Sequence, residues 1–211
     1  YMGARPSHPE LLDYLALQLQ QTGWRWKPLH REILLSETYQ QSAGFNEKAA
    51  AVDSDARLLW RFPPRRLEAE AIRDSILAVS GKLDRTIGGP GFSGFRVHRE
   101  NVRHYHPKSK YGPKDWRRMV YMTRVRKEVE SVFGVFDTPD GNCVTPRRTN
   151  STTPLQALNL LNSEFVMQQA RILASNLESR TKQPAEQIRE AYRVCYGRNP
   201  KQAEQKLATE L

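Results

Sequence analysis

Hydrophobic positions along the chain recur mainly at steps of three and four residues, which is the period of an amphipathic helix. The longest such stripe follows Thr153 and Pro154, which suit the N-cap and the first helical position, and Gln156 stands where a capping-box partner belongs. We expect one long helix that turns this stripe towards a core. Its members are Leu155, Leu158, Leu161, Phe165, Ile172 and Leu177, interrupted by the polar Gln169.

Shorter stretches with the same period predict further helices, most of them bounded by residues that begin or end helices. Residues 44–55 show little periodicity, and we expect a loop there. The predicted helices follow Ser7-His8-Pro9-Glu10 (ending near Gly23), begin at Lys27-Pro28, span Arg65 to Ser80, begin at Pro184, and span Lys201 to Leu211.

Residues 88–127 depart from the helical pattern. Four glycines between Gly88 and Gly94 stand in an order that fits no phosphate-binding motif, so a turn-rich loop is the better interpretation. A basic segment interleaved with aromatic residues follows, and extended runs such as Met119–Met122 leave room for a short hairpin. The predicted fold over 1–211 is therefore a single, mostly α, orthogonal domain of about six helices with a long irregular basic insertion.

The positive charge is concentrated in this insertion. The chain carries a net charge of +10, and residues 96–127 hold 11 Lys and Arg against two acids, Glu100 and Asp115. Such a patch can bind nucleic acid, an anionic surface or an acidic partner. The residues that we expect to bind anions are Arg117, Arg118, Arg124 and Arg126.

Composition excludes several other classes of protein. A length of 211 residues allows a proper core, the mean hydropathy of −0.70 is polar, and no apolar run is long enough to span a bilayer. The first residues lack the apolar segment of a signal peptide, and the chain starts without Met, so we expect a piece of a longer protein. Cys143 and Cys195 have no metal or redox spacing; free thiols are the preferred interpretation, although one disulfide stays open.

Two groups of polar residues are candidates for chemistry. Asp137 and Asp140, with Arg147 and Arg148, lie in the loop before the long helix and could form an acid/base pair with anion clamps. The preferred alternative is a loop folded by Asx turns and Arg–carboxylate hydrogen bonds. The second group, His98, His104 and His106, lacks a recognised metal-ligand spacing, so we expect surface histidines and no metal site.

Ordered blocks of sequence resemble a known family. They are Ser7–Asp13, Gly23-Trp24, Lys27–Arg31, Ser36–Ser42, Arg65–Asp74, Ala78–Asp84, Gly88–Pro90, Phe136–Asp140, Pro154–Leu158, Leu161-Asn162 and Tyr196–Pro200. With these blocks in this order, nearly the whole chain is similar to the C-terminal domain of unknown function of large planctomycete proteins that also carry a cytochrome-c-like domain.

The resemblance implies a multidomain, exported parent protein that is periplasmic, secreted or at the cell surface. It implies haem only in other domains of that parent, in agreement with the absence of a C-x-x-C-H motif here. No enzymatic activity is established for the family, so no catalytic residue can be carried over. The polar positions within or near the shared blocks form a candidate shared site: His30, Arg31, Arg65, Arg66, Glu70, Arg73, Asp74, Asp137, Asp140, Arg147 and Arg148.

Three functions follow as expectations. The preferred one is a docking module that contacts an acidic protein or an anionic polysaccharide, together with other domains of its parent. The first alternative is a hydrolase or redox-coupled enzyme acting on an anionic carbohydrate, which requires the carboxylates to converge in an open cleft. The second is nucleic-acid binding, which requires the aromatic residues of 105–121 to be exposed on one face.

Overall fold

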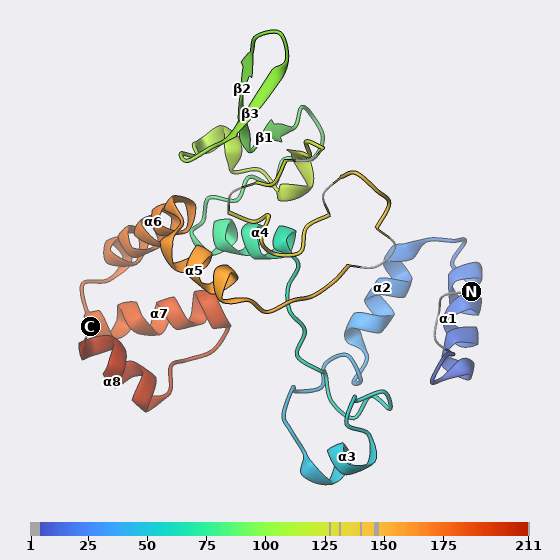
Figure 1. Ribbon diagram of the computed structural model, residues 1–211. Helices are drawn as coiled ribbons and strands as arrows, with labels where there is room; N and C mark the ends of the chain where they lie inside the picture. The colour runs from blue at the N-terminus through green and yellow to red at the C-terminus, as the bar shows by residue number, and fades with distance from the viewer. Residues whose placement is uncertain (1–4, 127, 131, 140, 146–147, 211) are drawn as a thin grey trace. The chain divides into compact units, whose positions relative to one another are not determined.

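A computed structural model describes residues 5–126, 128–130, 132–139, 141–145 and 148–210 of the chain. Helices make up 47% of it, and the described strands form only two small sheets, so the fold is mostly α, as predicted (Figure 1). The chain divides into two compact units, residues 1–66 and 67–211, which are described separately. The single domain of the sequence analysis stays a prediction.

The first unit contains α1 (Pro9–Gln21), α2 (Trp26–Leu35) and α3 (Glu47–Val52). The helix α3 lies where a loop was expected, so that prediction is wrong. Its signal is local: the Asn46 side chain accepts hydrogen bonds from the N–H groups of Lys48 and Ala49, and a run of three alanines follows.

Most apolar side chains of the first unit lie on its surface. Among its described hydrophobic residues, only Leu29 and Ala56 are fully buried, whereas Leu12 in the predicted stripe of α1 is 56% exposed. A pocket of about 460 Å³ lies between α1, α2 and the segment 56–65, lined mainly by apolar side chains. The helical period of this region therefore predicted α1 and α2 correctly but not a buried core.

The second unit contains two small sheets and the remaining helices. The short strands β1 (Phe92–Ser93) and β4 (Met122–Thr123) pair in parallel, while β2 (Phe95–Arg99) and β3 (Arg103–Pro107) form an antiparallel hairpin. The helices are α4 (Ala69–Val79), α5 (Pro154–Asn162), α6 (Glu164–Arg180), α7 (Pro184–Tyr196) and α8 (Gln202–Glu210), with 3₁₀ turns at Pro113–Asp115 and Met119–Tyr121.

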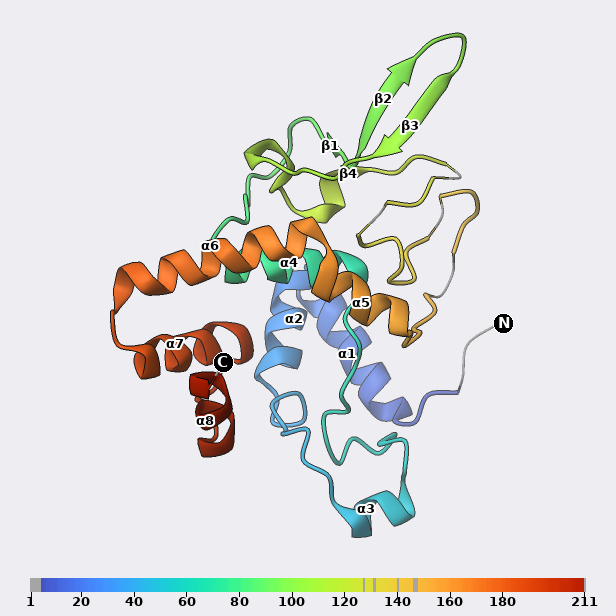
Figure 2. The same ribbon diagram turned by 60° about the vertical axis from the view of Figure 1, so that its left-hand side comes forward.

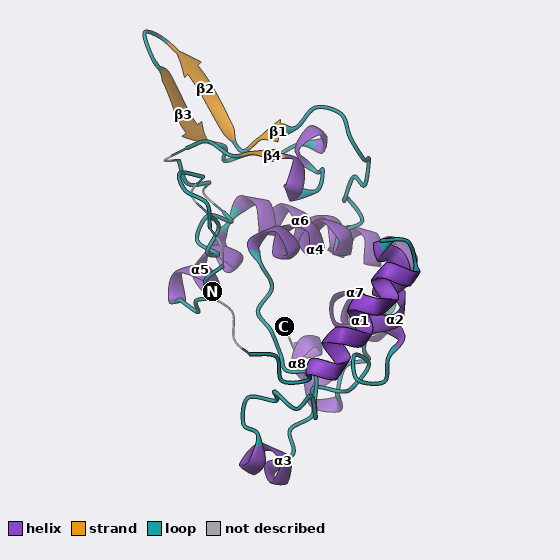
Figure 3. Cartoon of the chain, turned by 90° about the vertical axis from the view of Figure 1, so that its right-hand side faces the viewer, coloured by secondary structure: helices purple, strands orange, loops and turns teal. Residues whose placement is uncertain are grey.

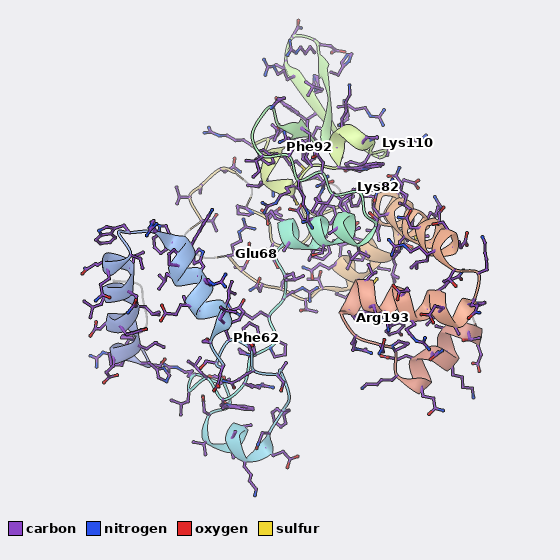
Figure 4. The ribbon with its side chains drawn as sticks, turned by 180° about the vertical axis from the view of Figure 1, so that it is seen from behind. Phe62, Glu68, Lys82, Phe92, Lys110 and Arg193 are labelled. Atoms are coloured by element: carbon purple, nitrogen blue, oxygen red, sulfur yellow. The ribbon has the colours of Figure 1, made fainter. Side chains whose placement is uncertain are left out.

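An aromatic cluster forms the core of this unit. Phe133 and Phe165 are each 1% exposed and meet edge to face at 5.4 Å, and Tyr111 meets Phe165 in the same way at 5.3 Å. Figure 4 shows the side chains crowded between α4 and the strands, with Phe92 among them. The buried Glu130 carboxylate joins the cluster because it accepts a hydrogen bond of 2.6 Å from the Tyr111 hydroxyl.

The predicted long helix is interrupted at Ser163, which ends α5 and caps α6 through a hydrogen bond from the N–H of Val166. This break turns the stripe out of register. Phe165, Gln169 and Leu177 on α6 are buried, whereas the three leucines of the stripe on α5 are more than half exposed (Leu155, Leu158 and Leu161). Leu160, outside the stripe, packs against the core. The capping box of Thr153 and Gln156 is present as predicted.

The basic insertion contains the hairpin that the sequence left room for, but not in the expected run. Met119–Tyr121 is a 3₁₀ turn, whereas β2 and β3 pair Phe95 with Pro107 through to Arg99 with Arg103. Figures 1, 2 and 3 all show this hairpin extending beyond the rest of the second unit. Because it stands away from the core, both of its faces are accessible along most of their length.

None of the helices in the described part of the chain is long and apolar enough to cross a membrane. Cys143 and Cys195 are exposed free thiols.

Candidate functional site

The helix α4 gathers three of the candidate polar residues. Arg73 and Asp74 follow Glu70 by three and four positions, so both lie on the same side of the helix as Glu70. That side meets the segment 115–124 and the loop around Arg148. The structure therefore brings together the part of the predicted site that lies on α4.

Arg73 is a buried structural residue. Its side chain is 1% exposed, it donates hydrogen bonds to the backbone carbonyls of Arg117 (2.7 Å) and Asp115, and its guanidinium lies 4.8 Å from the centre of the Phe92 ring. Burial lowers the pKa of Arg73, and the negative charges of nearby acids such as Asp74 oppose this effect. The guanidinium fastens the insertion to α4 and is shielded from any solvent-borne ligand.

The two acidic residues of α4, Glu70 and Asp74, also make hydrogen bonds and ion pairs within the fold. Arg148 donates two hydrogen bonds to Glu70, at 2.7 and 3.0 Å, and Arg124 donates a third at 3.2 Å. Asp74 accepts a hydrogen bond of 2.8 Å from the N–H of Met119 and lies 3.4 Å from the Arg118 guanidinium. Both carboxylates therefore hold distant segments of the chain against α4.

The balance of forces at Glu70 favours its charged form. Burial acts to raise the pKa of Glu70, but the hydrogen bonds and charge of Arg148, with the charge of Arg124, hold that pKa below its ordinary value. Such a carboxylate stays ionised at neutral pH and is poorly suited to donate a proton as a general acid.

Asp137 organises the loop before α5. It adopts a left-handed backbone conformation (φ 54°) and accepts hydrogen bonds from the N–H (2.7 Å) and the hydroxyl (2.9 Å) of Ser151. The buried side chain of Gln156 donates to that same hydroxyl oxygen at 3.2 Å and to the Val135 carbonyl at 2.9 Å. Ser151 is thus a donor to Asp137 that the sequence did not predict, and Arg148, predicted to pair with the carboxylates of this loop, donates to Glu70 of α4.

The remaining candidates lie outside the described residues or in the first unit. Asp140 and Arg147 lie outside the described residues. Arg65 and Arg66 end the first unit, and His30 and Arg31 line a shallow pocket of about 380 Å³ on α2 with Lys27.

The predicted anion-binding arginines are mostly engaged in internal contacts. Arg117 stacks 4.1 Å from the centre of the Tyr121 ring and donates to the backbone carbonyls of residues 86, 88 and 90. Arg118 contacts Asp74, and Arg124 contacts Glu70. Arg118, Arg124 and Arg126 are nevertheless exposed residues.

Further exposed basic residues, which the sequence did not single out as anion ligands, lie on the hairpin. The register places Arg99 opposite Arg103, His98 opposite His104, and Arg96 opposite His106. Pairs of like charge directly across two strands destabilise a hairpin. Among the described ion pairs, only that between His98 and Glu100, at 3.0 Å, involves a residue of the two strands. The signal that could have revealed this arrangement is the alternation of basic and other residues on either side of Glu100-Asn101-Val102.

The pockets do not supply a catalytic constellation of the predicted kind. An open pocket of about 480 Å³ beside α4 is lined by Asp74, Arg85 and Arg118, and neither Glu70 nor Asp137 contributes to it. Within the described ranges, no three His, Cys, Asp or Glu side chains are placed to hold a metal ion. Nucleic-acid binding would require the aromatic residues of 105–121 to be exposed, but Tyr111 is buried.

We predict that Glu70→Gln weakens the fold in a pH-dependent manner. At neutral pH it should lower the free energy of unfolding by about 1 kcal/mol, since the ion pair with Arg148 is partly exposed. The depressed pKa of Glu70 makes its contribution complete above the unfolded pKa, about 4.3, and lost as the pH falls through the folded value. Urea denaturation of the two proteins should therefore differ at neutral pH and converge in acid.

Glu68→Gln is the matched control, because Glu68 is 56% exposed and lies 3.8 Å from the same arginine. It should shift the unfolding free energy by no more than about 0.3 kcal/mol. Equal effects of the two substitutions at neutral pH would show that Glu70 is not a specific anchor.

Comparison with known proteins identifies a family whose function is unknown. A family model described as "PSD1: Protein of unknown function (DUF1553)" matches residues 1–211. No curated protein matches the chain. No solved structure matches it either.

Proposed function

The chain belongs to the DUF1553 family, whose function is unknown, and we propose that it acts as a docking module whose β2–β3 hairpin binds an anionic polysaccharide. The observation that carries the proposal is the pairing of like charges across the hairpin, where Arg99 stands directly opposite Arg103. This arrangement costs stability in the free protein. A polyanion laid along the strands would relieve that repulsion.

The surroundings of the hairpin support the same proposal. The residues of the two strands from Arg96 to Arg99 and from Arg103 to His106 are exposed or half-buried, and the hairpin extends into solvent (Figure 3). Figure 4 shows side chains standing out from it with no other element opposite them. Long charged side chains in this position can reach an extended ligand without rearrangement of the core.

A polysaccharide fits this surface better than a folded acidic protein. Stable protein interfaces depend on a few apolar or aromatic anchors that enter a pocket. The strand residues that line one face of the hairpin are Arg96, His98, His104 and His106, and none of them is apolar. The opposite face, with Arg99 and Arg103, also carries Val97 and Tyr105. Contacts of exposed charges suit a linear polymer with repeated anionic groups, where many weak contacts add up.

The enzyme alternative has weaker support. Glu70 and Asp137 are held by donors from within the chain, at 2.7 Å from Arg148 and 2.7 Å from the N–H of Ser151. A general acid or base needs an accessible proton site within reach of the substrate. These two carboxylates instead serve as anchors for the insertion and for the loop before α5.

The proposal extends to the setting of the protein. In it, the chain is one domain of an exported planctomycete protein that also carries a cytochrome-c-like domain, and it works in the periplasm or at the cell surface. The resemblance of the sequence blocks is what supports this setting. Haem would then reside in the parent protein's other domains, while this domain holds the assembly on an anionic polymer.

Salt dependence tests the proposed function. The chain should bind dextran sulfate and not uncharged dextran, and raising the salt from about 50 to about 300 mM should weaken binding at least about tenfold, as screening and counterion release require. Calorimetry with both polymers measures this directly. Equal binding of the two polymers, or affinity that salt leaves unchanged, would contradict the proposal. Preferential binding of polyglutamate over dextran sulfate would favour an acidic protein instead.

A further inference from the structure

One face of the hairpin is made of titratable and basic side chains. Successive residues of a strand point to opposite faces, so Arg96 and His98 share a face with their cross-strand partners His106 and His104. Cross-strand neighbours of this kind lie about 5 Å apart, and diagonal neighbours about 7–8 Å apart. We call these four residues the histidine face. It contains three of the five histidines in the chain.

The surroundings of the histidine face leave it open. All four side chains are exposed. Glu100 in the turn contacts His98 at 3.0 Å, and Arg96 donates a hydrogen bond of 3.2 Å to the hydroxyl of Ser109. The other charged strand residues, Arg99 and Arg103, belong to the opposite face by the same alternation.

We propose that the histidine face is a pH-dependent binding site for the sulfate or carboxylate groups of an anionic polysaccharide, which binds more weakly above neutral pH and more tightly in mild acid. This rests on the proposed function and assigns it a site and a regulation. Arg96 carries a positive charge throughout, and imidazoles as a class gain a positive charge in mild acid. Charge gained on the histidines adds to that of Arg96, while the Glu100 carboxylate beside His98 offsets part of it.

Protonation also changes the energetics of the free hairpin. When the imidazoles are charged, His98 faces a like charge on His104, and His106 faces Arg96. Like charges directly opposite each other destabilise a strand pair. Binding of a polyanion cancels this repulsion, so the same protonation that weakens the free hairpin increases the gain on binding. The coupling makes the ligand and the protons bind cooperatively.

The test compares affinities for dextran sulfate at about pH 8 and about pH 5.5, at constant salt and with EDTA present, because sulfate groups stay ionised over this range while imidazoles do not. The wild-type chain should bind about tenfold more tightly in acid. A variant with His98→Gln, His104→Gln and His106→Gln should change by less than about twofold. His8→Gln with His30→Gln is the control, and it should retain the wild-type response.

Each outcome bears on one of the two proposals. Binding with equal affinity at both pH values would overturn the pH dependence and leave the docking function intact. A pH response that persists in the triple variant would assign it to other groups and overturn the histidine face. Absence of binding at either pH would overturn the docking function itself. Circular dichroism of the variants checks that each one is folded.

Discussion

Replacing Arg73 by Leu should lower the free energy of unfolding by about 3 kcal/mol or more, because it leaves two buried carbonyl groups without a donor. The Arg73 side chain reaches from α4 to the backbone of Asp115 and Arg117, and it packs against the Phe92 ring. Arg73→Lys should cost less, about 2 kcal/mol, since an ammonium keeps the charge but lacks the planar fork that serves both carbonyls. Urea denaturation measures both changes.

Arg85→Leu provides the control for this prediction. Arg85 is an exposed arginine of the same unit, so its replacement should change the free energy of unfolding by no more than about 0.5 kcal/mol. If Arg73→Leu unfolded at the same urea concentration as the wild type, the insertion would not depend on this anchor. The interpretation of the α4 polar residues as structural would then be wrong.

The second large effect concerns binding. Replacing Arg96, Arg99 and Arg103 by Gln should weaken binding of dextran sulfate roughly 10- to 100-fold at low salt, from about 0.5–1 kcal/mol for each exposed contact. The variant should remain folded, because removing the like-charge pair of Arg99 and Arg103 relieves repulsion across the strands. Calorimetry gives the affinity, and thermal denaturation gives the stability.

A second variant with the same net charge as the hairpin variant distinguishes binding by the hairpin from attraction by the overall charge of the protein. Arg171, Arg180 and Lys182 lie on or just after α6, and their replacement by Gln removes as much positive charge as the hairpin variant. Its affinity for dextran sulfate should fall about threefold at most, since long-range attraction is screened by salt. Equal losses in both variants would mean that net charge alone attracts the polymer.

The sequence predicted helices more reliably than it predicted which of their faces are buried. The capping box of Thr153 and Gln156 fixed the start of α5, but Ser163 ends that helix and begins the next. Serine is compatible with a helix interior in isolation, so only its capping role in the fold reveals the break. Within α5, Leu158 is exposed whereas Gln156 is buried, which the apolar stripe did not predict.

For the candidate site, the sequence predicted where the charged residues lie on the helix but not which residues they pair with. The spacing of Glu70, Arg73 and Asp74 placed them correctly on one side of a helix. Their partners Arg118, Arg124 and Arg148 are 44 to 78 residues away in sequence. Pairings over such separations depend on the path of the chain, which no local pattern encodes. They decide whether an arginine is available for a ligand or bound within the fold.

A hairpin in this region could be predicted from the sequence, but the pairing of its basic residues could not. Alternation within Phe95–Arg99 and Arg103–Pro107 is a strand pattern, and the structure gives it a register. That register turns separate basic residues into cross-strand pairs, and it gathers His98, His104 and His106 on one face. Without it, these histidines are indistinguishable from scattered surface residues.

Mapping of backbone amide chemical shifts during titration with dextran sulfate tests the central proposal most directly. The proposal predicts that the largest changes fall within residues 95–107 and grow as the pH is lowered. Shifts concentrated instead at the pocket of Asp74, Arg85 and Arg118, or in the loop of Asp137 and Ser151, would place the ligand on the candidate site of the second unit. That result would contradict docking through the hairpin.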